Sequence, residues 1–196
     1  MRTKYNKRRF KTIILILVLL IGMSIGYSYI NNSINEEGIF YVKNNTWDVH
    51  FDNLEVSAGS VEGDQVPIAA HILGDTTKVE YSIILKNPGE YYEFTLDTIN
   101  AGSINAMIDD ITTTIYEIDG KTEKELPKYL EYDFTYSDGS EIIKGQSLNS
   151  NKSEKIKVKV KFKEDIQKED LPNEDETLVI KQELNYVQKD DSAIDK

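Results

Sequence analysis

The stretch IKVKVKFK, residues 156–163, alternates apolar and basic side chains without interruption. Ile156, Val158, Val160 and Phe162 share one face of an extended chain, and lysines occupy the other face. Successive side chains of a β-strand point to opposite faces, so this pattern predicts a strand with one buried and one solvated face.

The same two-residue period recurs along most of the chain. It predicts further strands at residues 47–56, 79–85, 92–98, 111–118, 130–136 and 178–187. No helical pattern separates them, apart from a single turn in residues 164–172, where Pro172 favours a stop. Seven or eight short strands joined by turns predict an all-β fold, an antiparallel β-sandwich of the immunoglobulin or jelly-roll type.

One turn carries a prediction about strand pairing. Pro88 and Gly89 suit the two central positions of a type II turn, so residues 79–85 and 92–98 are expected to be adjoining antiparallel strands. The aromatic side chains after the turn would then point into the core and Tyr91 would point outward. A ligand site built on Tyr91 and its acidic neighbours is the less favoured alternative.

The N-terminus has a different character. Residues 1–11 contain six basic residues and no acid, and the next 19 residues, TIILILVLLIGMSIGYSYI (12–30), carry no charge. A helix of this length would span roughly 28 Å, close to the hydrocarbon thickness of a bilayer. The basic flank stays in the cytoplasm by the positive-inside rule, so we expect the chain after Asn31 to be exported.

Residues 1–30 are therefore expected to be either a signal peptide or a membrane anchor. The length of the apolar run favours a retained anchor, with the C-terminal domain outside the cell membrane. Gly26 and Ser28 are the candidate positions for signal cleavage, which would release a secreted protein. A buried core helix is disfavoured, because a small β-rich body could not cover it.

The remaining chain divides into three segments by composition. We expect a polar tether, a β-sandwich domain and a flexible acidic tail, at residues 31–45, 46–188 and 189–196 respectively.

Composition and motifs exclude several functions. The net charge is −11 although the N-terminus is basic, so the body would repel nucleic acid. The chain has no cysteine, and its two histidines, His50 and His71, lack the H-E-x-x-H spacing of zinc proteases. There is no nucleophile elbow, phosphate loop or dinucleotide fingerprint. We therefore predict no enzyme activity, no cofactor, and no catalytic or metal-binding residue.

Two charged features allow binding interpretations. Lys157, Lys159, Lys161 and Lys163 form a row that could bind anionic wall polymers, although such a row more often protects an edge strand from aggregation. The acids of residues 164–176 could hold calcium. They do not match a calcium loop, so a solvated acidic loop is favoured.

Several blocks of the sequence together resemble one protein family. They are the basic N-terminus, the apolar run ending in GYSYI, and WDVHFDNLEV (47–56), VEYSIILKNPGEYYEFTLDTINAGSINAMI (79–108), YSDGSEIIKGQSL (136–148) and LPNEDETLVIKQELNYVQ (171–188). The chain thereby resembles, over about residues 1–188, the TasA and camelysin group of exported Gram-positive proteins, which carry SipW-type signal peptides.

The resemblance implies a jelly-roll-like sandwich outside the membrane and a structural role at the cell surface or in the biofilm matrix. TasA-like subunits form fibres when the freed N-terminal segment of one subunit completes a sheet of the next. The weak cleavage site departs from that pattern, and without cleavage residues 31–45 could not be freely donated. Camelysin-like proteins are associated with metalloprotease activity, but the resemblance transfers no catalytic residue to this chain.

The sequence thus predicts a non-catalytic exported structural or interaction protein of the surface or biofilm matrix. Its expected partners are the membrane or a signal peptidase, copies of itself, or matrix proteins. The alternative is a membrane-tethered binding module for calcium or an anionic wall polymer, and a divergent metalloprotease is the least favoured interpretation.

Overall fold

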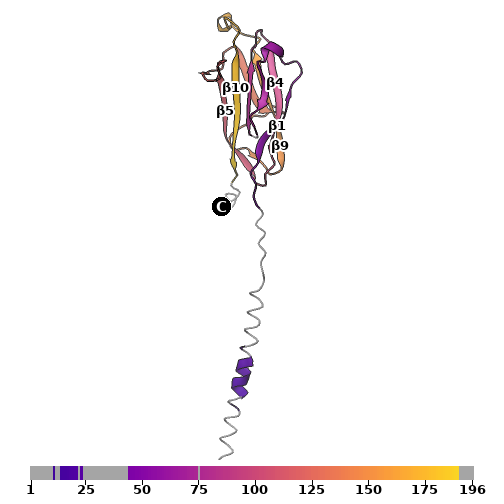
Figure 1. Ribbon diagram of the computed structural model, residues 1–196, viewed down its shortest axis with the longest axis vertical. Coiled ribbons are helices and arrows are strands. Elements are labelled where there is room, and N and C mark those ends of the chain that lie inside the picture. The colour runs from indigo at the N-terminus through magenta and orange to yellow at the C-terminus, as the bar shows by residue number, and fades with distance from the viewer. Residues whose placement is uncertain (1–10, 12–13, 22, 24–43, 75, 190–196) are drawn as a thin grey trace, which may run out of the picture. The chain divides into compact units, whose positions relative to one another are not determined.

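The computed structural model describes residues 11, 14–21, 23, 44–74 and 76–189 (Figure 1). Contacts divide the chain into two units, Met1–Lys43 and Asn44–Lys196. In the first unit, residues 14–21 are helical with exposed aliphatic side chains. Among the described residues, no helix combines the length and apolarity needed to cross a membrane. Gly26, Ser28, residues 31–43 and residues 190–196 lie outside the described residues.

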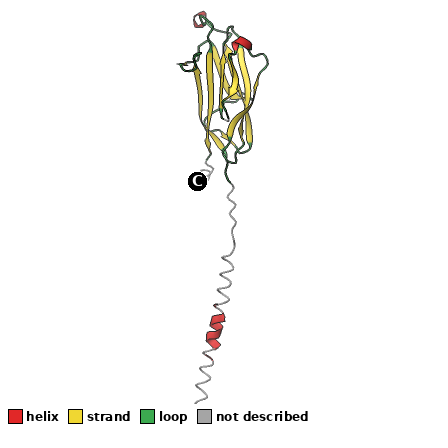
Figure 2. Ribbon diagram, viewed as in Figure 1, coloured by secondary structure: helices red, strands yellow, loops and turns green. Residues whose placement is uncertain are grey.

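The second unit consists mainly of antiparallel β-strands, as the all-β part of the predicted fold class requires (Figure 2). The strands are β1 (Val49–Val56), β2 (Ile68–Ile72), β3 (Lys78–Ile83), β4 (Tyr91–Asn100), β5 (Ala106–Tyr116), β6 (Glu123–Lys124), β7 (Leu130–Tyr136), β8 (Ser147–Leu148), β9 (Lys152–Phe162) and β10 (Leu178–Gln188). Two 3₁₀ turns, η1 (Gly63–Gln65) and η2 (Lys168–Asp170), interrupt the loops. The second turn, η2, lies within residues 164–172, where the sequence predicted a single helical turn.

The strands form two sheets. The first has the order β1-β4-β9-β7, and the second has the order β2-β3-β10-β5-β6, with β8 also paired to β5. In Figure 1, β5 and β10 lie on one side of the unit and β1, β4 and β9 on the other. β9 is a central strand, with β4 and β7 as its two neighbours.

The buried faces of both sheets contribute to one hydrophobic cluster. All four apolar residues of the β9 pattern are at most 1% exposed, which confirms the predicted orientation of that strand. The rings of Tyr81 in β3 and Phe94 in β4 meet edge to face, with centroids 5.1 Å apart. Since these residues belong to different sheets, their contact lies between the two layers.

The turn at residues 87–90 forms as predicted, but the strand pairing predicted across it is wrong. Glu90 N donates to Asn87 O at 3.1 Å, and Gly89 has a φ of +90°, as a type II turn requires. However, β3 pairs with β2 and β10, whereas β4 pairs with β1 and β9. The chain therefore crosses from one sheet to the other at this turn.

A carboxylate satisfies backbone groups where the chain crosses. Glu90 Oε2 accepts hydrogen bonds from the backbone N–H groups of Lys86 and Asn87, at 2.7 and 3.1 Å. Desolvation raises the pKa of Glu90, but hydrogen bonds from Asn87, Lys86 and Gln65 outweigh it and lower the pKa overall. The backbone groups that would begin a hairpin ladder are thus satisfied by a side chain, and the strands are free to separate.

Other boundaries also differ from the sequence prediction. The strand expected at 111–118 begins at Ala106 and ends at Tyr116, and β2, β6 and β8 were not predicted. β6 and β8 are two residues long and exist only because β5 pairs with them. No local periodicity can reveal such short strands.

The segment that leads into β1 is fastened to the loop after β4. Ser103 N donates to Thr46 O and Ala101 N donates to Asp48 O, both at 2.9 Å. Gly102 lies between them, and a Cβ atom there would be 2.5 Å from Thr46 O and 2.8 Å from the Asp48 nitrogen. This close approach of two backbone segments requires glycine.

We expect Gly102→Ala to cost about 1–3 kcal/mol of stability, because the added methyl group collides with backbone atoms. Trp47, the chain's single tryptophan, lies within the fastened segment and is 46% exposed there, so we expect its fluorescence to shift when the segment undocks. The matched control is Gly63→Ala, where a Cβ atom would meet nothing within 4 Å although the φ is +62°. An unchanged Trp47 emission in Gly102→Ala would contradict the assignment.

Candidate functional site

The lysine row lies in the middle of a sheet, so its interpretation as edge protection is wrong. β9 has β4 on one side and β7 on the other, and the edges of this sheet are β1 and β7. Lys159 Nζ lies 2.9 Å from Glu93 Oε2 and 4.5 Å from the centroid of the Tyr91 ring. The Tyr91 region therefore belongs to the outer face of the scaffold, where it packs against this lysine.

Carboxylates from both neighbouring strands flank the row. Lys159 is directly opposite Glu93 in β4 and Asp133 in β7. Lys161 binds Glu164 at 2.7 Å, and Lys163 donates to the backbone oxygen of Lys128. Only neutral threonines stand directly opposite Lys157, namely Thr95 and Thr135. An anionic polymer would have to compete with these acids, and its binding stays a prediction.

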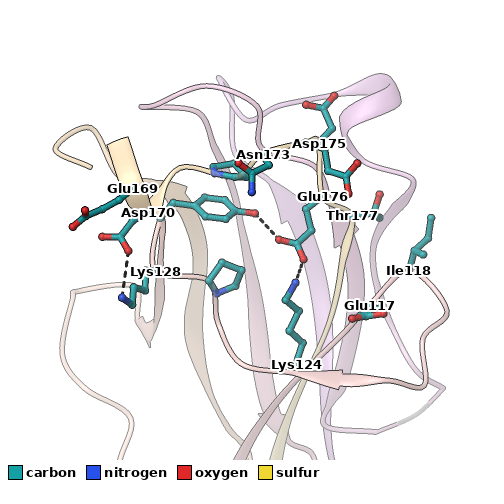
Figure 3. A pocket seen from close by; sticks show the side chains of 14 residues that line it. Glu117, Ile118, Lys124, Lys128, Glu169, Asp170, Asn173, Asp175, Glu176 and Thr177 are labelled. Atoms are coloured by element: carbon teal, nitrogen blue, oxygen red, sulfur yellow. Dashed lines mark hydrogen bonds and ion pairs between the residues drawn. The ribbon is translucent and has the colours of Figure 1, made fainter. Parts of the chain in front are cut away.

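The acid-rich segment at 164–176 borders an open pocket of about 750 Å³ (Figure 3). Glu176 forms an ion pair with Lys124 and accepts a hydrogen bond of 3.0 Å from Tyr129. Asp170 pairs with Lys128 at 3.3 Å. In the part of the chain that the structure describes, no three acidic or histidine side chains converge as metal ligands. Calcium binding is thus left as a prediction without a ligand set.

The two histidines lie in different sheets. His50 in β1 has its Nδ1 atom 2.7 Å from Asp48 Oδ1, and His71 in β2 has its Nδ1 atom 3.0 Å from the backbone oxygen of Ala69. Each histidine is thus engaged by the residue two positions before it in the chain.

The sequence pattern did not reveal one further feature: between β5 and β7, some core-facing side chains are partly exposed to solvent. Ile111 and Thr113 of β5 stand opposite the fully buried Leu184 and Gln182, on the core-facing side, yet Ile111 is half-buried and Thr113 is exposed. Tyr132 and Phe134 of β7 stand opposite the buried Val160 and Val158 and are also half-buried. We call these four residues, Ile111, Thr113, Tyr132 and Phe134, the seam.

The seam exists because one side of β5 is incompletely paired. β8 pairs with residues 106–107 and β6 with residues 115–116, and no described strand pairs with residues 109–114 on that side. Along an antiparallel strand, the backbone groups of successive residues point alternately to the two neighbouring strands. Glu117, just after β5, donates its N–H toward β6, to Thr122 O. Ile111 and Thr113 are an even number of residues from Glu117, so their backbone N–H and C=O groups also point to that side, where β5 is open.

A buried polar group marks the seam from within. Gln182 is 0% exposed, and its Oε1 atom accepts hydrogen bonds from the hydroxyl groups of Thr113 and, at 2.8 Å, Tyr132. The Tyr81 hydroxyl is buried with no hydrogen-bond partner. Burial raises the pKa of Tyr81, and the neighbouring Tyr132 adds to the shift. The sequence signal for this group is a glutamine at a position of the predicted strand 178–187 whose side chain should face the core.

A double-mutant cycle tests the charge ladder of the first sheet. We expect Glu93→Gln and Lys159→Met to show a coupling of about 0.3–1 kcal/mol in urea unfolding, because the pair is cross-strand and partly screened by solvent. High salt should reduce the coupling. The matched control is a cycle between Lys157 and Thr95, which should give none. Equal coupling in both cycles would show that the ion pair has no specific effect.

No protein-family model, curated protein or solved structure matches this chain. The likeness to the TasA and camelysin group therefore rests on the sequence blocks quoted above. The described geometry, and the seam in particular, carries the functional inference.

Proposed function

We propose that the chain is a non-catalytic, exported structural protein of a bacterial surface or matrix, and that it assembles by strand addition at the seam. Its two sheets would form a jelly-roll or immunoglobulin-like sandwich, as in the TasA and camelysin group that its sequence resembles. The observation that carries the proposal is the open side of β5 between β6 and β8.

The open side of β5 has both components that strand addition uses. The outward backbone groups of Ile111 and Thr113 can pair with an incoming strand, and the half-buried side chains of Ile111 and Phe134 offer it apolar contact. Natural proteins usually blunt such edges with charges or cover them. Here Asp109 and Asp110 lie at one end of the opening only, and Asp109 is paired with Lys144.

The length of the opening suits a short donor segment. Six residues, 109–114, lie between β6's partners and Ile108, which is hydrogen-bonded to Gly145 and Gln146, and they correspond to roughly 20 Å of extended chain. Residues 38–43, GIFYVK, contain a run of four apolar residues with high β-propensity, and they lie outside the described residues. We take this run, in a neighbouring copy of the chain, as the donor.

The alternative function, a membrane-tethered module that binds anionic polymers, has weaker support. Carboxylates from β4 and β7 accompany the lysine row, and Lys159 and Lys161 already hold carboxylate partners. The attraction for a polyanion is therefore reduced by the row's own neighbours.

The proposal predicts that proline at position 113 blocks strand addition. Thr113→Pro removes an outward N–H group while leaving the hydrogen bonds between β5 and β10 in place, because proline is tolerated where the N–H faces away from the sheet. We expect the full chain to bind a fluorescent peptide copying residues 36–45 about five- to ten-fold more weakly, measured by anisotropy.

The matched control for this test is Thr113→Val, which removes the hydroxyl group but keeps the backbone N–H. Its peptide binding should stay close to that of the unmodified chain. Undiminished binding to Thr113→Pro, or no binding to the unmodified chain, would contradict strand addition at this edge.

If the chain is exported and its donor segment is released by cleavage, a second prediction follows. Protein recovered from the culture medium should begin near Tyr27 or Tyr29, because cleavage beside Gly26 or Ser28 would free residues 31–45. Intact mass and N-terminal sequencing of the medium and membrane fractions measure this directly. A full-length chain confined to the membrane fraction would leave the donor segment tethered and would count against fibre assembly.

A further inference from the structure

The hydroxyl group of Tyr132 joins the two sheets across the seam. Tyr132 belongs to β7, an edge strand of the first sheet, and it donates to Gln182 Oε1 in the second sheet at 2.8 Å. Thr113 on β5 donates to the same oxygen. One acceptor atom therefore holds both edges that border the seam, and the Tyr132 side chain spans the space between them.

This contact crosses the space into which an added strand would turn its core-facing side chains. A strand paired with the open side of β5 would lie beside residues 109–114 and present alternate side chains to the core. Tyr132 extends from β7 between the two sheets, because its hydroxyl group reaches Gln182 on β10, the strand next to β5. Entry of a strand therefore requires the Tyr132 side chain to give way.

The contact can open at small cost. When Tyr132 leaves, Gln182 Oε1 keeps the Thr113 hydroxyl as a donor, so no buried acceptor is left unpaired. Tyr132 is on an edge strand and its side chain is partly exposed, so its hydroxyl group reaches water once the side chain turns outward. A neutral hydrogen bond of this kind contributes little net stability, which suits a contact that must break.

We propose that Tyr132 is a latch, whose hydrogen bond to Gln182 holds the seam closed in the free subunit and must break to admit an added strand. This regulation rests on the proposed function, because it acts on the same acceptor edge. The latch prevents the exposed edge from capturing strands indiscriminately, a hazard of open β-edges.

The chain contains no cysteine, so a single introduced thiol gives an unambiguous probe. Ile111→Cys places that thiol on the seam, in a half-buried position. We expect Tyr132→Phe, combined with Ile111→Cys in the full chain, to raise the rate of maleimide labelling about three- to ten-fold, the range for losing one neutral hydrogen bond.

Tyr186→Phe is the matched control. The Tyr186 hydroxyl also joins the two sheets, through Thr98 at 3.3 Å, but Thr98 is on the central strand β4, which contributes no residue to the seam. Labelling should stay at the parent rate in this variant. An unchanged rate in Tyr132→Phe, or an equal rise in both variants, would overturn the latch.

Peptide binding separates the latch from the proposed function. If both the latch and strand addition operate, Tyr132→Phe raises the labelling rate and also raises the affinity for the peptide of residues 36–45, by a similar factor. Faster labelling without any peptide binding supports the latch and rejects strand addition. Unchanged labelling with strong peptide binding rejects the latch and supports strand addition.

Discussion

The structure depends on the burial of one face of β9. Its four apolar side chains are at most 1% exposed, and they lie at the centre of the sheet that β4 and β7 extend on either side. The opposite face places lysines between the carboxylates of those neighbours, so the strand is at once the hydrophobic centre and the positive column of its sheet. Acidic cross-strand neighbours favour such a strand, and β4 and β7 supply them opposite Lys159 as Glu93 and Asp133.

Two local devices bring the second sheet onto this one. The Glu90 carboxylate satisfies the turn after β3, and the chain can then cross to the other layer instead of forming a hairpin. At the end of β4, Gly102 allows the segment before β1 to lie against the loop. Both devices satisfy backbone groups where no strand ladder is available, because the chain changes sheets between β3 and β4 and again between β4 and β5.

The seam is the consequence of incomplete pairing along one side of β5. β5 is longer than the short strands that cover its outer side, so core-facing positions remain accessible between them. A polar group, Gln182, occupies the interior at this point, and hydroxyl groups from both sheets converge on it. A surface that combines unpaired backbone, apolar side chains and a displaceable tyrosine is suited to adding a strand, and the proposed assembly and its latch both follow from it.

The sequence by itself determined the strand periodicity, the burial of alternate residues and the turn at Pro88 and Gly89, because these depend on neighbouring residues and on the two-residue repeat of a strand. Only the tertiary structure decided that β3 and β4 separate, that the lysine row is central, and that β5 is open between β6 and β8. Pairing partners are chosen by contacts between residues far apart in the chain, which periodicity does not encode. For the same reason Gln182 was visible as a polar residue in core phase, whereas its meeting with Tyr132 required the two sheets to be in place.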